Sequence, residues 1–296
     1  MADTDRRSRA RAAIQAVASA CNLPTDLTIL SERWNTVAEL GESDVVAKSA
    51  TLAHLSRIDP LHWFEQEVRV CGELRATGAM VHVPWSGLQQ CVLQDGYPIT
   101  LWQKVDGETA ISSETELVDS LVAVHHKGES IALQQPWFAT ITVEIPGTLE
   151  MLLERNVLAS SEIATLNDHL KRLLDHIDRA SLPGGFLHGD AQRKNSIHTD
   201  DGPIWIDLEE TCSGPFAWDL ACLTMNPIFD SERVLNRYAE MSGISRVSID
   251  NLVVLKQVRE LEGLVWMLAI QDERDQAFRD EMQAQLARVL TVASAD

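Results

Sequence analysis

The stretch Phe186-Leu-His-Gly-Asp-Ala-Gln-Arg-Lys-Asn-Ser-Ile197 and the run Ile204-Trp-Ile-Asp-Leu-Glu209 carry the strongest signal in the sequence. They have the form H-x-D-x-x-x-x-N, followed about a dozen residues later by an apolar strand that ends in aspartate. Phosphoryl transfer needs one carboxylate to orient the attacking hydroxyl and accept its proton. It also needs an amide oxygen and a second carboxylate to hold Mg²⁺ across the nucleotide phosphates. Asp190, Asn195 and Asp207 fit these roles in chain order.

The first half of the sequence offers a lysine that could contact nucleotide phosphates. Lys48 ends the run Val45-Val-Ala-Lys48 in a predicted strand, and a lysine flanked by apolar residues is uncommon. Alone, it is typical of a solubility charge on an edge strand. The motif around Asp190 reverses that preference, because phosphoryl transfer needs a cation on the nucleotide side of the cleft.

A lysine in a cleft needs a carboxylate to hold it, and the next predicted helix carries Glu65 and Glu67. Residues two apart on a helix point about 200° apart, so only one of them can face the cleft. Glu67 lies three residues after Phe64 and four before Cys71, which are apolar positions expected to face the interior. The spacing therefore predicts that Glu67 pairs with Lys48 and that Glu65 faces away.

Hydrophobic periodicity divides the chain into a mostly β first part and a mostly helical second part. Short apolar runs bounded by turn residues predict strands at residues 28–30, 36–40, 44–49, 81–85, 90–93 and 99–105. One helix is expected from Pro60 to about Gly78 and an amphipathic helix over Ile163–Ile177, and the pattern is helical from Leu220 onward.

This pattern predicts an α+β fold of two lobes with a cleft between them. Residues 1–103 are expected to form an N-terminal nucleotide-binding lobe, a small antiparallel sheet with one main helix. Residues 104–296 are expected to form a larger, mainly helical lobe for catalysis and substrate binding.

The composition excludes several classes of protein. Apolar residues make up 45% of the 296 residues and charged residues 23%, as in ordinary globular proteins, so disordered and collagen-like chains are excluded. The formal net charge of −19 argues against a nucleic-acid or anionic-membrane partner, because both reward basic patches. No stretch approaches the ~18 apolar residues of a membrane helix.

The cysteines and the N-terminal segment indicate a cytoplasmic location. Five cysteines without a C-x-x-C spacing are typical of reduced thiols rather than of a disulfide framework or a zinc site. Several arginines precede the stretch Ala12–Cys21, an arrangement loosely similar to a secretion signal. Because Gln15 and Ser19 interrupt this stretch, a short amphipathic helix is the preferred interpretation.

The segments His188-Gly-Asp190, Asn195, Ile206-Asp-Leu-Glu209 and Gly214-Pro215…Trp218-Asp-Leu-Ala221 resemble the aminoglycoside phosphotransferase and choline kinase-like family. The resemblance covers roughly residues 28–225 in order, and this combination is far more specific than H-x-D alone. It implies a protein-kinase-like two-lobe fold. It also implies an enzyme that uses ATP and Mg²⁺ to phosphorylate a hydroxyl group of a small molecule.

The resemblance assigns roles to the motif residues. Asp190 is the expected catalytic base, and Asn195 and Asp207 are the expected ligands of Mg²⁺. Glu209, two residues after Asp207, is expected to tune the metal site or to face the substrate. The resemblance also supports Glu67 as the ion-pair partner of Lys48 beside the nucleotide.

Two other residues are expected to support the site. Asp219 matches a family aspartate that accepts backbone N–H groups and braces the catalytic loop. His188 is expected to be a packed, hydrogen-bonded core residue.

The segment Thr100-Leu-Trp-Gln-Lys-Val-Asp-Gly107 resembles the family's connection between the lobes. The backbone groups of Gln103 and Val105 are the expected partners of adenine, because an extended strand presents N–H and C=O groups on alternate sides. Trp102 either borders the base pocket or is a core aromatic residue; both interpretations stay open.

Two segments depart from the family pattern. The turn Ser31-Glu-Arg-Trp-Asn35 has no glycine, so phosphate contacts would fall to Ser31, Arg33, Asn35 or backbone amides. Gln192-Arg-Lys194 places two cations beside the expected base, where they either stabilise the transferred phosphate or, in the preferred interpretation, are solvated loop charges.

The acceptor is expected between the catalytic loop and the C-terminal helices. These helices carry Trp266 and several carboxylates that could receive a cationic acceptor: Glu260, Glu262, Asp272, Glu273 and Asp275. Each carboxylate alone is more typical of a solvated helix face. The favoured acceptor is an aminoglycoside-like antibiotic or an amino sugar. The alternatives are a metabolite kinase for sugars, choline-like or homoserine-like acceptors, and a non-catalytic nucleotide-binding pseudokinase.

Overall fold

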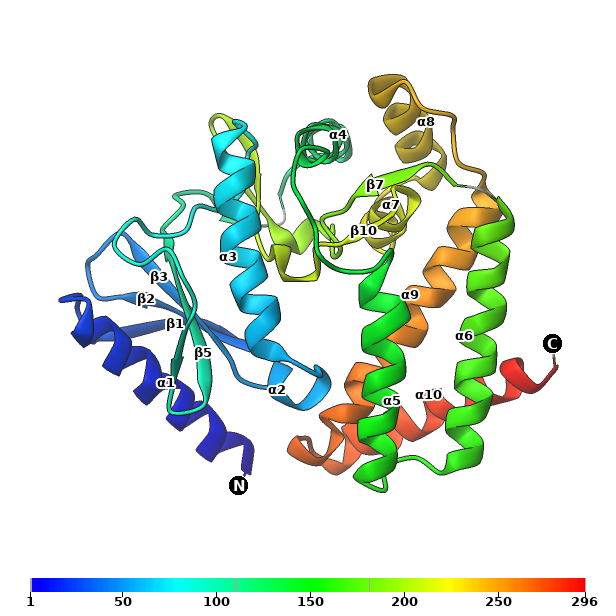
Figure 1. Cartoon of the computed structure of the whole chain (residues 1–296), viewed down its shortest axis with the longest axis horizontal. Coiled ribbons are helices and arrows are strands. Elements are labelled where there is room, and N and C mark those ends of the chain that lie inside the picture. Colours follow the sequence, from blue (N-terminus) through cyan, green and yellow to red (C-terminus); the bar gives the residue numbers. More distant parts are fainter. Residues whose placement is uncertain (1, 110, 181, 296) are drawn as a thin grey trace.

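The computed structural model describes residues 2–109, 111–180 and 182–295. In it a β-sheet with a helix on each face lies beside a larger, mainly helical part (Figure 1). The five strands are antiparallel, in the order β1-β2-β3-β5-β4. They are β1 (Leu27–Glu32), β2 (Asn35–Leu40), β3 (Val45–Ala50), β4 (Val92–Gln94) and β5 (Tyr97–Gln103). The sheet that the sequence predicts is confirmed in its main strands.

One predicted strand is wrong. Residues 81–85 form only isolated bridges, from Val81 to Trp205 and from Pro84 to Trp102. The segment changes partner within its length: the N–H of His82 donates to the carbonyl of Trp205, whereas Val83 and Trp85 exchange backbone hydrogen bonds with β5. No single ladder therefore runs through residues 81–85.

The side chains of β3 alternate between the two faces of the sheet, and each face is covered by a different helix. Val45 and Ala47 pack in a core cluster with Ile14 of α1 (Ala2–Ala20), so the N-terminal helix that the sequence predicts is confirmed and belongs to the fold. Because successive residues of a strand face opposite sides, Lys48 lies on the other face. There it meets α3 (Pro60–Ala76), whose predicted apolar stripe is buried.

The second part is built from helices around a large apolar core. Its longest helices are α4 (Glu114–Gly128), α6 (Ser160–Ala180), α9 (Ile249–Ala269) and α10 (Gln276–Ala295). Shorter helices are α5 (Ile145–Glu154), α7 (Ala217–Thr224) and α8 (Ser231–Ser242). The predicted amphipathic stripe over Ile163–Ile177 is confirmed, because its apolar residues lie in this core.

Small strands flank the loops of the motif Phe186–Ile197. The strand β7 (Gly184–Phe186) pairs with β10 (Ser213–Pro215), and β8 (Ser196–Thr199) pairs with β9 (Gly202–Trp205). The motif Phe186–Ile197 therefore begins on the antiparallel pair β7–β10 and ends on the antiparallel pair β8–β9. All five cysteines are free, and within the described ranges no helix is long and apolar enough to cross a bilayer.

We expect Ile14→Ala to lower the free energy of unfolding by about 2–4 kcal/mol, because Ile14 is fully buried between α1 and the sheet. Urea unfolding followed by circular dichroism measures this. Leu30→Ala is the matched control, since Leu30 is 54% exposed, and it should change the free energy by less than about 0.5 kcal/mol. Equal effects of the two substitutions would contradict the packing of α1.

Candidate active site

The loop after β7 brings Asp190 and Asn195 into direct contact. The Nδ2 atom of Asn195 donates to the Oδ2 atom of Asp190 at 2.8 Å and to its backbone carbonyl at 2.9 Å. Gly189 permits this turn, because its φ is +94° and an added Cβ would lie 2.2 Å from the carbonyl oxygen of Glu210. The amide thus orients Asp190 and turns its own carbonyl oxygen away from that carboxylate.

The carboxylate of Asp219 holds the same loop in place. It accepts the N–H groups of His188 at 2.7 Å and Gly189 at 3.0 Å, and it contacts the Nε2 atom of His125 at 2.7 Å. His188 is fully buried, with its Nε2 atom 3.1 Å from the carbonyl oxygen of Ile206. Both residues are therefore placed to support the loop rather than to touch a ligand.

Lys48 reaches the second motif across the cleft. Its Nζ atom donates to Glu67 at 2.9 Å and to Asp207 at 2.5 Å, and lies 3.1 Å from Glu209. Glu65 is exposed, so the choice of Glu67 over Glu65 is confirmed. Asp207 has a left-handed φ of 64°, which is uncommon outside glycine and typical of functional positions.

Buried carboxylates outnumber buried cations in this region. Lys48, Arg57 and Arg259 form one continuous set of ion pairs with Glu67, Asp190, Asp207, Glu209, Glu210 and Glu262. Burial raises the pKa of Glu67 to about 7 and that of Glu210 to about 8, even though Lys48 and Arg259 oppose the shift. The excess of negative charge favours binding of further cations.

The residues present fit a magnesium ion that also takes phosphate oxygens and water. Asp207 lines the cavity and offers a carboxylate oxygen, and Asn195, in contact with the lining residue Asp190, offers an amide oxygen. Hard oxygen ligands are what Mg²⁺ prefers. In the part of the chain that the structure describes, no three His, Cys, Asp or Glu side chains form a metal site of their own. A nucleotide-bound Mg²⁺ does not need one, since it is commonly held by one or two carboxylates plus phosphates.

The backbone of Gln103, an expected partner of adenine, is partly engaged within the protein. Its N–H donates to the carbonyl of Val83 at 2.9 Å, and its own carbonyl lies 3.0 Å from the His82 ring. Because a carbonyl oxygen has two acceptor positions, that of Gln103 keeps one for a ligand, and Val105 stays the second candidate. Trp102 is 1% exposed and stacks on His82, as expected for a core aromatic residue.

The turn without glycine lies at the cleft. Asn35 is buried and its Nδ2 atom lies 3.4 Å from Glu209, whereas Trp34 at the tip packs edge-on against Trp266 of α9 with ring centroids 6.4 Å apart. Ser31 and Arg33 do not line the cavity beside the motif. Of the three side chains expected from the sequence to contact phosphate, Asn35 alone lines this cavity.

Two arginines of the site were not predicted from the sequence. Arg57, just after α2 (Ala53–Ser56), pairs with Glu209 at 3.2 Å and Glu210 at 2.9 Å. Arg259 of α9 pairs with Asp190. Arg57 stands in a loop without any pattern, but Arg259 falls on the apolar stripe of α9 that includes Leu255, and a charge in such a stripe is a signal of a buried ion pair.

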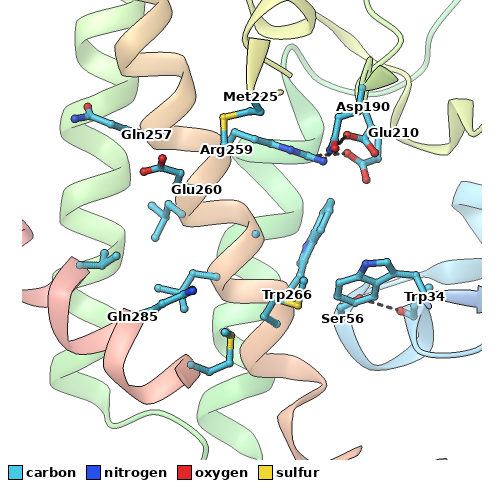
Figure 2. A pocket seen from close by; sticks show the side chains of 18 of the residues that line it. Trp34, Ser56, Asp190, Glu210, Met225, Gln257, Arg259, Glu260, Trp266 and Gln285 are labelled. Atoms are coloured by element: carbon cyan, nitrogen blue, oxygen red, sulfur yellow. Dashed lines mark hydrogen bonds and ion pairs between the residues drawn. The ribbon is translucent and has the colours of Figure 1, made fainter. Parts of the chain in front are cut away.

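A cavity of about 920 Å³ extends from this cluster into the helical part. Asp190, Asp207 and Arg57 are among its lining residues, as are several residues of α9 and α10. Figure 2 shows Asp190 and Glu210 close together, and Glu260 on α9 farther along the cavity. Three expected acceptor carboxylates lie elsewhere: Asp272, Glu273 and Asp275 do not line the cavity. Glu262 is fully buried against Arg259, so it is not a solvated acceptor ligand.

Comparison with known proteins places the chain in a family. The family model described as "Phosphotransferase enzyme family" matches residues 42–261, well over half of the chain. The chain belongs to this family. It is therefore a phosphotransferase that acts on a hydroxyl group of a small molecule, and its kinase-like fold is confirmed. No curated protein matches the sequence significantly.

Solved structures of similar fold include enzymes with different acceptors. Amicoumacin kinase hAmiN, solved with AMP-PNP, Ca²⁺ and Ami, has a TM-score of 0.70 at 13% identity, covering 97% of this chain and 95% of that one. Choline kinase LicA from Streptococcus pneumoniae has a TM-score of 0.68 at 15% identity, covering 94% and 98%. Aminoglycoside phosphotransferase APH(3'')-Id from Streptomyces rimosus, solved with ADP and streptomycin, has a TM-score of 0.58 at 15% identity, covering 80% and 92%.

We expect Glu262→Gln to stabilise the phosphotransferase at pH 8 by about 1–3 kcal/mol. Burial raises the pKa of Glu262 to about 7 despite the charge of Arg259. The folded chain therefore binds this proton more tightly than the unfolded chain, and stability falls as pH rises from about 4.5 to 7. Urea unfolding at pH 8 and pH 5 should show the gain at pH 8 only.

The exposed Glu154 provides the control for this experiment. Glu154→Gln should leave the unfolding free energy unchanged at both pH values. A Glu262→Gln protein that is less stable than the wild type at pH 8 would contradict the assigned direction.

Proposed function

We propose that the chain is an ATP-dependent small-molecule kinase that uses Mg²⁺, with Asp190 as the base that orients the acceptor hydroxyl. The contact between Asp190 and Asn195 carries this proposal, together with Asp207, which binds Lys48 and lines the same cavity as Asp190. Asn195 and Asp207 would hold Mg²⁺, which neutralises charge on the nucleotide phosphates when bound.

Asp190 and Lys48 have different roles in the proposed phosphoryl transfer. The acceptor oxygen attacks the γ-phosphorus, an O–P bond forms, and the bond to ADP breaks. The hydroxyl proton passes to the Oδ2 atom of Asp190, which returns it to solvent after release of the products. Lys48, held by Glu67, supplies positive charge on the nucleotide side, and the pKa of Lys48 stays well above its ordinary value because its three carboxylates outweigh burial.

We further propose that the acceptor is large, with an aminoglycoside-like antibiotic or an amino sugar favoured. The cavity volume of about 920 Å³ supports this, because it lies near the top of the range for drug-sized ligands. A choline-like or homoserine-like acceptor would fill a small share of it, and a metabolite kinase of that kind is the alternative. Phosphorylation of an antibiotic would make the enzyme a resistance factor, working in the cytoplasm where ATP is available.

The nucleotide is proposed to bind between two lobes that divide near Gln103, residues 1–103 and 104–296, with adenine at the backbone of Gln103 and Val105. The complete set Lys48, Asp190, Asn195 and Asp207 argues against a non-catalytic pseudokinase, since loss of activity usually leaves a gap in this set.

We expect the wild-type enzyme to consume ATP with at least one member of a panel of aminoglycosides, other antibiotics, amino sugars and amino alcohols. We expect Asp190→Ala to lower kcat by at least ~100-fold while ATP still binds. The coupled measurement of ADP release and mass spectrometry of the acceptor check this. Asp200→Ala, in the exposed β8–β9 turn, is the control and should keep full activity. Full turnover by Asp190→Ala would contradict the role of the base.

We expect Asp207→Ala to abolish the Mg²⁺-dependent part of ATP affinity, because the metal loses its carboxylate ligand. Isothermal titration calorimetry with and without Mg²⁺ measures this, again with Asp200→Ala as the control. An equal gain in affinity from Mg²⁺ in the variant and the wild type would remove Asp207 from the metal site.

A further inference from the structure

Arg259 joins the proposed base to two other carboxylates. Its Nη2 atom donates to the Oδ1 atom of Asp190 at 2.5 Å, and its Nη1 atom donates to Glu210 at 3.2 Å and to Glu262. Figure 2 shows the side chain extending from α9 across the end of the cavity to Asp190 and Glu210. The guanidinium group thus lies where an acceptor must approach the reacting atoms.

The contacts of Asp190 are shared unequally between its two oxygens. Oδ1 accepts from Arg259 and from the Nε2 atom of Gln192 at 2.6 Å, which uses both of its acceptor positions. Oδ2 accepts one hydrogen bond, from Asn195 at 2.8 Å, while Lys194 stays 3.8 Å away. One acceptor position of Oδ2 is therefore left for the hydroxyl of an acceptor molecule.

The guanidinium group is itself held firmly. It lies 5.8 Å from the ring centroid of Trp218 and 5.7 Å from that of Trp266, within range of cation–π attraction to both. Glu210 and Glu262 bind it from η3 (Leu208–Glu210) and from its own helix. The planar guanidinium group has several N–H donors in fixed directions and can bridge three carboxylates. The ammonium group of lysine cannot bind them with the same geometry.

From these contacts we infer that Arg259 is a positioning residue for phosphoryl transfer: it fixes Asp190 through Oδ1 so that Oδ2 faces the acceptor hydroxyl. The inference rests on the proposed function of the same site. Because Arg259, Glu210 and Glu262 are already bound to one another, the carboxylate needs no rearrangement when the acceptor arrives, and such preorganisation lowers the barrier of the chemical step.

A purely structural role for Arg259 makes a different prediction. In that case the arginine would only neutralise buried carboxylates, so its loss would lower the melting temperature and leave kcat per folded molecule unchanged. The positioning role predicts a fall in kcat with little change in ATP affinity, and recovery when a free guanidinium ion fills the vacated place.

The test compares Arg259→Ala and Arg259→Lys with Arg237→Ala. The control removes an arginine–aspartate pair, with Asp119, that joins α8 to α4 and does not line the cavity. For Arg259→Ala we expect kcat to fall at least ~100-fold, with the Kd of Mg-ATP within about threefold of wild type, and for Arg259→Lys a fall of about tenfold. Guanidinium chloride in the low millimolar range should restore Arg259→Ala at least ~10-fold. It should change neither Arg237→Ala nor Asp190→Ala.

A kcat of Arg259→Ala within threefold of wild type, or a loss that guanidinium does not reverse, would overturn the inference. If Arg259→Ala does not fold, Arg259→Lys decides, and a wild-type kcat in that variant would overturn it. Transfer to the acceptor and hydrolysis of Mg-ATP are both measured in the wild type. Absence of both overturns the proposed function and this inference with it, whereas an active wild type with an unimpaired Arg259→Ala overturns this inference alone.

Discussion

The ammonium group of Lys48 lies among the carboxylates of Glu67, Asp207 and Glu209, and the rest of the cleft is arranged around that contact. A buried ion needs partners that offset its lost hydration. For Lys48 on β3 these partners come from α3, which carries Glu67, and from the segment after β9, which carries Asp207 and Glu209. The three elements are distant in sequence, and this single cation ties them together.

From Lys48 the ion pairs continue through Glu209, Arg57 and Glu210 to Arg259 and Asp190, so that the proposed nucleotide side and the proposed acceptor side of the cleft are joined by one set of charges. Substitutions within such a network are not expected to be additive. The cluster is richer in carboxylates than in cations, which favours the proposal that the nucleotide binds together with Mg²⁺.

Much of this site could be predicted because its signals are local. The spacing of Glu67 from Phe64 and Cys71 gave its orientation, and Asp190 and Asn195 stand five residues apart on one loop. The contacts of Arg57 and Glu210 could not be predicted, since they join separate loops through tertiary packing alone. Arg259 stood in the apolar stripe of α9 and could have been recognised. One expectation failed for a tertiary reason: residues 81–85 form no continuous strand, because their first half bonds to Trp205 and their second half to β5.

The most direct test is a crystal structure of the chain with a non-hydrolysable ATP analogue and Mg²⁺. We expect Mg²⁺ at about 2.0–2.1 Å from oxygens of Asn195 and Asp207, with the γ-phosphate between Lys48 and Asp190. A nucleotide bound elsewhere, or a metal ion that contacts neither Asn195 nor Asp207, would contradict it.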